Sequence, residues 1–190
     1  MIYNLQALKK AYISGKNLKF LFFWGHTPAA DGRVTEACLS QWWKCKFTVD
    51  GITYSCTEQF MMAEKARLFQ DQEMESMIMK ANDPKVMKAY GRAVQNFNKE
   101  TWDNSCYEIV KKGNLAKFSQ NEELWEFLKT TGKKRILVEA SPRDRIWGIG
   151  MGKNNPDAEN PVKWRGTNLL GFALTEVRDI LLEREGSAVD

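Results

Sequence analysis

The hydrophobic period of the chain changes at Thr57. Before this residue, two short segments rich in strand-forming residues, 44–49 and 52–56, flank the dipeptide Asp50-Gly51. A two-residue Asp-Gly turn between such segments is a strong hairpin signal. After Thr57, apolar residues recur at the three- and four-residue spacing of an amphipathic helix. A small hairpin followed by mainly helical sequence predicts an α+β fold in which helix dominates.

Capping signals divide the helical sequence into segments. The motif Ser55-x-x-Glu58 resembles a capping box, in which Glu58 accepts a backbone N–H at the start of the first helix. Asp83 precedes Pro84 at a first helical position, and Gly91 is placed to end that helix. Helices are predicted at residues 57–69, 73–81, 84–90, 100–117 and 121–131, the last of these ending at Gly132, and a final helix begins near Thr167 or Asn168.

Two further segments are predicted to be strands and two to be loops. Residues 19–24 are an aromatic run that ends at Gly25, and residues 135–140 contain the apolar sequence Ile-Leu-Val. Residues 27–38 are rich in turn-forming residues, which indicates a loop. Residues 152–163 offer few side chains that bury apolar area, and we expect a mobile loop there.

The composition is that of a soluble globular protein. Of the 190 residues, 43% are hydrophobic and 27% are charged, which excludes a chain dominated by disorder. The length favours one domain over residues 1–190. The longest apolar runs fall far short of the ~20 residues that cross a bilayer, and the N-terminus carries no secretory pattern. We therefore expect no membrane association and a cytoplasmic location, or a nuclear one in a eukaryote.

Cysteine and histidine are too sparse for the usual metal and triad sites. The four cysteines show no CxxC spacing, and His26 is the one histidine. This pattern argues against a zinc site, and a Ser-His-Asp or Cys-His arrangement would depend on His26 alone. The formal net charge of +4 permits nucleic-acid binding without establishing it, and the densest basic runs are Lys111-Lys112 and Lys133-Lys134-Arg135. Any chemistry would therefore rely on carboxylates and lysine.

Glu58 and Lys65 lie on one face of the predicted helix. Seven residues span about two turns at 3.6 residues per turn, so both side chains project to the same side, with Met62 between them. A carboxylate near a helix N-terminus is stabilised as the anion, and a lysine beside apolar side chains is shifted toward its neutral form. The pair is a candidate for acid–base or covalent catalysis. The alternative is that Glu58 only caps the helix and that Lys65 is a solvated surface charge.

A second candidate site follows the strand predicted at 135–140. There, Asp144 and Trp147 stand beside Gly148 and Gly150. Glycine permits a close approach of backbone to ligand, its amide can face a phosphate oxygen, and an indole can stack on a base or a sugar. No helix of Rossmann type follows, so the dinucleotide fingerprint is not met. The alternative is a tight aromatic turn that plugs the core.

Three isolated residues each have a functional and a structural interpretation. Arg92 either clamps a phosphate with its guanidinium or is a surface arginine at a helix end. Asn168 either binds a ligand or caps the last helix, and its local sequence favours capping. Trp102 lies on the apolar stripe of its helix and is predicted to be a core residue.

Several short segments occur together in one order, and jointly they resemble the NADAR (YbiA-like) family. They include Phe22-Phe23-Trp24-Gly25, Tyr54-Ser55-Cys56-Thr57-Glu58-Gln59-Phe60 with Lys65-Ala66, Gly91-Arg92, Asp144-Arg145-Ile146-Trp147-Gly148-Ile149-Gly150, and Asn168-Leu169-Leu170-Gly171. The resemblance covers about residues 20–183. One departure is Gln41-Trp42, where the family often has Asn-Phe.

The resemblance implies an N-glycosidase, which cleaves the bond between a ribose anomeric carbon and an amine nitrogen. The family has two substrate classes: phosphorylated ribosylamino-pyrimidine intermediates of riboflavin biosynthesis, and ADP-ribose attached to guanine in DNA. Proteins that act on the second class are antitoxins or repair enzymes, so a cognate ADP-ribosyltransferase toxin is a candidate partner. From the expected loop at 152–163 and the basic balance we predict the DNA substrate. The riboflavin intermediate is the alternative, and a non-catalytic ADP-ribose or nucleic-acid binding module is an alternative of another class.

The resemblance also implies which residues form the site. By matching position, Glu58, Lys65 and Asp144 are the candidate catalytic residues. The candidate substrate-binding residues are Phe23 at the rim, Arg92, Trp147, Gly148, Gly150 and Asn168. Two routes stay open: Glu58 and Asp144 act as a carboxylate pair, or the sugar ring opens to an imine that neutral Lys65 attacks. Both routes use Glu58 as the proton carrier, and neither needs a metal or a cofactor.

Overall fold

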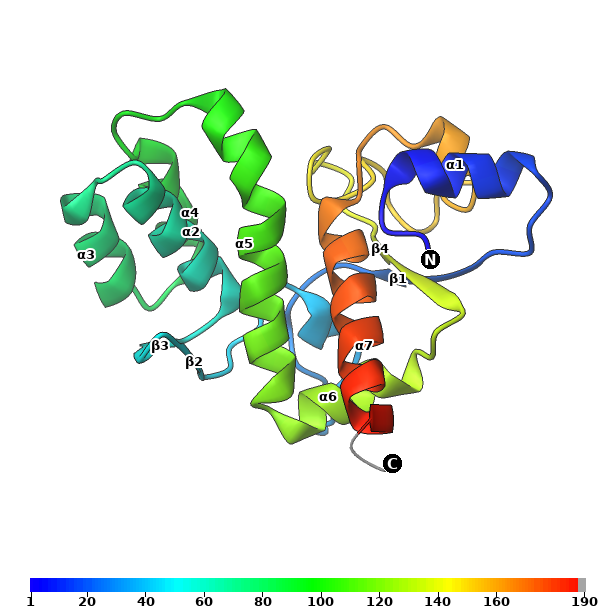
Figure 1. Cartoon of the computed structure of the whole chain (residues 1–190), viewed down its shortest axis with the longest axis horizontal. Coiled ribbons are helices and arrows are strands. Elements are labelled where there is room, and N and C mark those ends of the chain that lie inside the picture. Colours follow the sequence, from blue (N-terminus) through cyan, green and yellow to red (C-terminus); the bar gives the residue numbers. More distant parts are fainter. Residues whose placement is uncertain (188–190) are drawn as a thin grey trace. The chain divides into compact units, whose positions relative to one another are not determined.

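The computed structural model describes residues 1–187. These residues form two compact units: unit 1 combines Met1–Ser40 with the chain from Glu123 onward, and unit 2 is Gln41–Glu122. Figure 1 labels the helices and strands of both. The expected single domain over residues 1–190 stays a prediction. Helices with two small sheets confirm the predicted α+β class.

Unit 1 contains a two-stranded parallel sheet. Its strands are β1 (Lys19–Phe23) and β4 (Arg135–Glu139), which confirm the two predicted strands. The long helix α7 (Leu169–Ser187) packs along β4 (Figure 1). A Cβ at Gly171 would lie 2.1 Å from the carbonyl oxygen of Leu137, so only glycine allows this approach.

The other helices of unit 1 are short. They are α1 (Leu5–Ile13), the 3-10 helices η1 (Glu36–Leu39) and η2 (Pro161–Lys163), and α6 (Glu122–Thr130). The signals described above do not predict α1, although Asn4 accepts the N–H of Ala7 at 2.8 Å as an N-cap and Leu8 is buried. The helix η1 overlaps the end of the segment 27–38 that was predicted to be a loop. Gly132 follows α6 with a φ of +64°, as predicted for the residue after a helix end.

The segment predicted to be a mobile loop, 152–163, is a series of hydrogen-bonded turns. The indole N–H of Trp164 donates to the carbonyl oxygen of Ala158 at 2.7 Å, and Ala158 is buried. Lys163 forms an ion pair with Asp157 at 2.7 Å. The predicted loop is confirmed, and it has a buried anchor although it is polar in sequence; its mobility stays a prediction.

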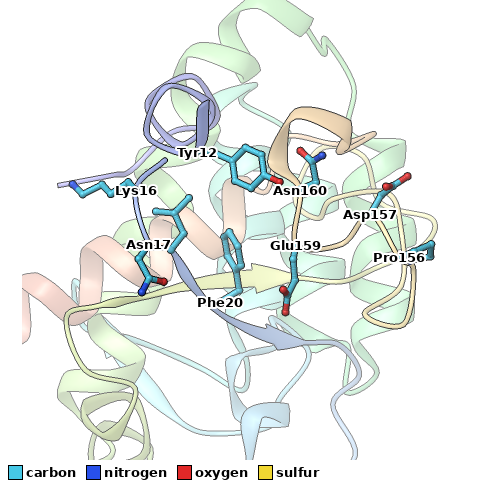
Figure 2. A pocket seen from close by; sticks show the side chains of 9 residues that line it. Tyr12, Lys16, Asn17, Phe20, Pro156, Asp157, Glu159 and Asn160 are labelled. Atoms are coloured by element: carbon cyan, nitrogen blue, oxygen red, sulfur yellow. The ribbon is translucent and has the colours of Figure 1, made fainter. Parts of the chain in front are cut away.

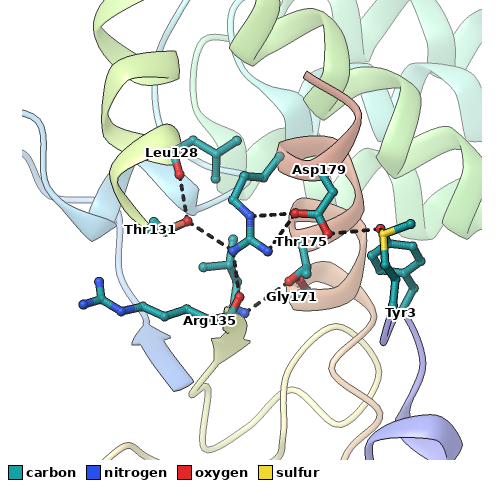
Figure 3. A network of polar contacts seen from close by, with 10 residues as sticks. Tyr3, Leu128, Thr131, Arg135, Gly171, Thr175 and Asp179 are labelled. Carbon is teal, nitrogen blue, oxygen red and sulfur yellow. Dashed lines mark hydrogen bonds and ion pairs between the residues drawn. The ribbon is translucent and has the colours of Figure 1, made fainter. Parts of the chain in front are cut away.

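A buried arginine connects three parts of unit 1 (Figure 3). Arg178 of α7 has no exposed surface and forms an ion pair with Asp179 at 2.9 Å. Its guanidinium also donates to the carbonyl oxygen of Arg135 at 2.7 Å and to the hydroxyl of Thr131 at 3.2 Å. Asp179 accepts the hydroxyl of Tyr3 at 3.0 Å, and burial together with this carboxylate raises the pKa of Tyr3. A buried charge is stable only with such partners.

Unit 2 begins with the predicted hairpin. Strands β2 (Phe47–Val49) and β3 (Ile52–Tyr54) pair antiparallel, with Asp50 and Gly51 at the turn. Both turn residues have positive φ, 51° and 78°, as a two-residue turn of type I′ requires. The hairpin prediction is confirmed.

The rest of unit 2 is a group of helices around α2. They are α2 (Thr57–Leu68), α3 (Gln72–Lys80), α4 (Pro84–Ala93) and α5 (Lys99–Ser119). Gly91 was predicted to end α4 but lies inside it. Glycine is needed there because a Cβ would come within 1.9 Å of the sulfur of Met62 on α2. Gly113 of α5 has the same role opposite Phe60, at 2.5 Å. Glycine thus brings two helices close to α2.

Candidate functional site

The predicted site residues divide between the two units. Unit 2 contains Glu58, Lys65 and Arg92. Unit 1 contains Phe23, Asp144, Trp147, Gly148, Gly150 and Asn168.

Glu58 is a buried carboxylate in the first turn of α2. Its side chain is 3% exposed, and its N–H donates to the carbonyl oxygen of Gln41 at 2.9 Å. The predicted capping box is wrong: the N-cap residue is Cys56, and no side chain caps the helix there. Gln59 instead accepts the N–H and the hydroxyl of Ser55, at 2.8 and 3.0 Å. The helix dipole favours the anionic form of a carboxylate at this position.

A buried amide pair supports the start of α2. Asn114 of α5 has no exposed surface and donates to the side-chain oxygen of Gln41 at 2.8 Å. The carbonyl oxygen of Gln41 also accepts the hydroxyl of Thr57 at 3.2 Å. Gln41, the position that departs from the family pattern, thus holds the turn that carries Glu58. The sequence signal that could have found Asn114 is a polar residue on the buried stripe of its helix.

Lys65 is half-buried and makes three contacts. Its ammonium donates to the carbonyl oxygen of Gly91 at 2.7 Å. It lies 4.3 Å from the ring centre of Phe97 and 5.5 Å from that of Trp102. Burial, and then the positive charge of Arg92, lower the pKa of Lys65. Lys65 is therefore not a solvated surface charge, and its neutral form is easier to reach than that of an ordinary lysine.

Two aromatic residues beside Lys65 were not identified as site residues from the sequence. Trp102, predicted to be core, is only partly buried, and Phe97 is 45% exposed. Phe97 packs edge-on against Phe69 at 5.3 Å, which orients its ring. Exposed rings of this kind offer stacking surfaces for a base, and Arg92, exposed in the last turn of α4, adds a cation. No local signal marks Phe97, because only the packing of α2, α4 and α5 brings it to Lys65.

In unit 1, Asp144 organises the loop that follows β4. One carboxylate oxygen, Oδ1, accepts the N–H groups of Ile146 and Trp147 at 2.9 and 2.8 Å. The N–H of Asp144 donates to the hydroxyl of Ser141 at 3.2 Å. The second oxygen, Oδ2, accepts no hydrogen bond from residues 1–187. Asp144 therefore fixes the backbone at Ile146 and at the partly buried Trp147 with one oxygen.

The two glycines of this loop serve its packing. A Cβ at Gly148 would lie 2.8 Å from the carbonyl oxygen of Glu139, and Gly150 has a φ of +68°. The N–H of Gly150 donates to the carbonyl oxygen of Asp144 at 2.9 Å. The expectation that this amide faces a phosphate is therefore wrong for Gly150. Trp147 is partly buried, and Ile149 has no exposed surface, so the loop also contributes to the core.

The side chains of Phe23 and Asn168 are buried within unit 1. Phe23 is 2% exposed, so its predicted place at a rim is wrong, whereas Trp24 is 64% exposed. Asn168, with a φ of 56°, accepts the N–H of Glu139 at 2.9 Å and donates to the carbonyl oxygen of Leu137 at 3.0 Å. Its side chain therefore does not cap α7 but joins that helix to β4.

Residues 1–187 contain neither a metal-ligand cluster nor a membrane-spanning helix. Within residues 1–187, no three His, Cys, Asp or Glu side chains are grouped as a metal site would need. None of the helices in this range has the length and apolar character to cross a membrane. Chemistry without metal or cofactor stays a prediction.

The sequence matches the NADAR domain family over residues 22–182. The chain belongs to this family. The matched range contains every predicted site residue and parts of both units. The predicted family membership is confirmed.

Curated relatives and a solved structure agree with this assignment. N-glycosidase R617 of Acanthamoeba polyphaga mimivirus is 40% identical over 166 residues, which cover 85% of this chain and 95% of that protein. N-glycosidase YbiA of Escherichia coli (strain K12) is 31% identical over 133 residues, which cover 70% and 74%. The NMR structure of the E. coli protein YbiA has a TM-score of 0.70 at 24% identity and covers 88% of this chain and 87% of its own. The fold is therefore that of YbiA.

Proposed function

We propose that this NADAR protein removes ADP-ribose from guanine bases in DNA. The class of reaction follows from its relatives, several of which are named N-glycosidases. The protein is a hydrolase that acts on N-glycosyl bonds. The DNA substrate is our choice within that class, and it agrees with the predicted cytoplasmic or nuclear location.

The observation that carries the proposal is the surrounding of Lys65. An amine with a lowered pKa lies between two aromatic rings, and Glu58 is buried two turns away on the same helix. Arg92, beside the amine, is an exposed cation that suits a phosphate oxygen. A carboxylate, a nucleophilic amine, stacking rings and a phosphate-binding cation suit the cleavage of a phosphorylated ribosyl amine by way of a lysine imine.

This arrangement supports the lysine route. The ribose ring opens, which leaves an imine between the anomeric carbon and the guanine nitrogen. The lone pair of neutral Lys65 forms a bond to that carbon. The Glu58 carboxylate takes the two protons of the lysine nitrogen in turn and passes each to the guanine nitrogen, whose bond to the carbon then breaks. Water then adds to the new lysine imine, releases ADP-ribose as the aldehyde and restores the amine. Asp144 and Trp147 belong to unit 1 and stay predicted site residues.

The substrate choice is tested by supplying both family substrates. Purified protein is incubated with an oligonucleotide that carries ADP-ribosylated guanine and, separately, with a phosphorylated ribosylamino-pyrimidine, and products are separated by chromatography. We expect free ADP-ribose and an unmodified oligonucleotide from the first. Release of pyrimidine from the second, with the oligonucleotide untouched, contradicts the DNA substrate.

Replacing Glu58 tests catalysis against mere binding. We expect Glu58→Gln to lower kcat by about 10²- to 10⁴-fold, because the proton donor is lost, while ADP-ribose binding measured by calorimetry is retained. Glu73→Gln is the matched control, since Glu73 is also the second residue of its helix and is exposed. Equal turnover in Glu58→Gln and the control removes Glu58 from the mechanism and favours a binding module.

The lysine route has its own test. Borohydride added during turnover should reduce the imine and attach ADP-ribose covalently to Lys65, detected by intact mass and peptide mapping. Lys65→Arg should give no adduct. An active preparation that never yields the adduct excludes the imine and leaves the carboxylate route.

A further inference from the structure

A groove of about 530 Å³ lies at the amino ends of β1 and β4 in unit 1. The side chains that line it include Lys16, Lys19, Lys133, Lys134 and Arg135. The parallel register explains this gathering: Lys19 opens β1 and is paired with Arg135, which opens β4. Two basic segments more than a hundred residues apart in sequence therefore form one surface.

The positive charge of this groove is uncompensated. All five cations are exposed, and none forms an ion pair with a residue in 1–187. The one acidic residue in the lining is Asp179, whose carboxylate is paired with Arg178 and accepts Tyr3. In Figure 3 the guanidinium of Arg135 points away from this network. The acid therefore does not neutralise the cations.

The groove accounts for the net charge of the whole chain. The chain has 28 Lys and Arg against 24 Asp and Glu. Five of the former and one of the latter line the groove, which leaves 23 of each elsewhere. A net charge concentrated on one concave surface attracts a polyanion more strongly than the same charge dispersed.

A neighbouring pocket of the same unit provides a contrast (Figure 2). It has a volume of about 400 Å³ and shares Lys16 with the groove, but Asp157 and Glu159 also line it. Mixed charge does not favour a polyanion, whereas five of the six charged side chains that line the groove are basic.

We propose that the groove binds the phosphodiester backbone of a DNA strand. The choice of DNA over other polyanions rests on the proposed function. The groove is at the opposite end of β4 from the Asp144–Gly150 loop, and a five-residue strand spans about 13 Å at ~3.3 Å per residue. At the stacked spacing of ~3.4 Å per nucleotide, this length corresponds to about four nucleotides.

Binding of unmodified DNA tests the groove without turnover. A labelled single-stranded 12-mer is titrated by fluorescence anisotropy at several salt concentrations, with wild type and Lys133→Gln/Lys134→Gln. Each lost phosphate contact lowers the salt slope by about 0.7, so the double variant should lose about 1.4 and bind about 25-fold more weakly at 0.1 M salt. Lys16→Gln/Lys19→Gln should behave alike, which separates binding from any folding defect of one variant.

Two exposed lysines outside the groove supply the control. Lys80 and Lys85 of unit 2 form no ion pair with the described chain, so Lys80→Gln/Lys85→Gln removes the same charge. The proposal is overturned if wild type shows no salt-dependent binding, if the groove variants bind like wild type, or if the control loses as much.

Turnover separates this proposal from the proposed function. The groove variants should raise KM for a modified oligonucleotide with at least four flanking nucleotides, and leave turnover of ADP-ribosylated guanosine, which has no backbone, unchanged. No turnover of either substrate by wild type contradicts the function alone. Equal loss on both substrates contradicts the groove, because its residues would then act on the reaction itself.

Discussion

Lys65 shows how neighbouring helices change the chemistry of one side chain. It belongs to α2, donates to a carbonyl oxygen of α4, and lies against an aromatic ring of α5. Burial removes water from the ammonium, and Arg92 repels it, so its pKa falls. The helical period predicts that Lys65 shares a face with Glu58. It does not predict the rings or the neighbouring cation.

Removing the charge of Arg92 should raise the pKa of Lys65. In Arg92→Gln the burial of Lys65 remains but the repulsion by Arg92 is lost, so the charged form of Lys65 is less disfavoured. The pKa is measured by NMR titration of lysine labelled with ¹³C at Cε. Lys85→Gln, a change of the same charge at the other end of α4, is the control and should leave the Lys65 titration in place. A Lys65 pKa that is unchanged or lower in Arg92→Gln contradicts this account.

The lowered pKa of Lys65 also makes the stability of the protein depend on pH. Because the pKa of Lys65 is lower in the folded protein than in the unfolded chain, the unfolded chain binds more protons between the two values. The contribution of Lys65 to the free energy of unfolding therefore rises with pH through this window and is lost as the pH falls through the folded pKa. In Arg92→Gln the pH range between the folded and the unfolded pKa of Lys65 should become narrower.

At the level of elements, glycines set how closely helices approach. Gly91 faces Met62, and Gly113 faces Phe60, both on α2. Turn statistics assign Gly91 to a helix end, because glycine is common there. The tertiary contact overrides that assignment, since no other residue leaves room for the methionine.

Gly91→Ala should therefore destabilise the protein. The new methyl group forces Met62 and α4 apart, which costs about 1–3 kcal/mol by analogy with overpacked cores. The free energy of unfolding of Gly91→Ala and wild type is measured by guanidinium denaturation. Gly186→Ala is the control: Gly186 is also helical but faces open space, so alanine there should be neutral or stabilising. Equal stability of Gly91→Ala and wild type would show that α4 moves without cost.

Asn168 joins α7 to β4 and should matter for stability more than for ligand binding. Asn168→Ala leaves the buried N–H of Glu139 and carbonyl of Leu137 without their partner, at a cost of about 2–4 kcal/mol for the two groups. Asn160→Ala, which removes the cap of η2, should cost about 1 kcal/mol or less. Thermal unfolding compares them. A smaller loss for Asn168→Ala than for the control contradicts the joining role.

At the scale of the whole molecule, ligand binding should appear as thermal stabilisation. ADP-ribose at 100 times its Kd adds about 2.7 kcal/mol, which for 190 residues raises Tm by about 5–11 °C. Glu58→Gln should show the same rise, because it keeps the binding groups. Arg92→Gln and Trp147→Ala should show a smaller one, since they lose a phosphate and a stacking contact. A Glu58→Gln variant that loses the shift would make Glu58 a binding residue.

Much of the fold follows from local signals. Period, caps and the Asp50-Gly51 turn predict most elements to within a few residues, because each depends on neighbours along the chain. Local signals are insufficient where burial decides the structure. The segment 152–163 is polar but contains the buried anchor Ala158, and Gly91 lies inside its helix, where only glycine leaves room for Met62.

The order of residues determines that Glu58 and Lys65 share one helix face, that Asp144 precedes Trp147 in a glycine loop, and that the chain belongs to the NADAR family. Tertiary structure alone decides that Lys65 has a lowered pKa between Phe97 and Trp102, and that dispersed lysines form one groove. The reason is physical: spacing along a helix or turn is a local property, whereas desolvation and charge density depend on which distant segments pack together.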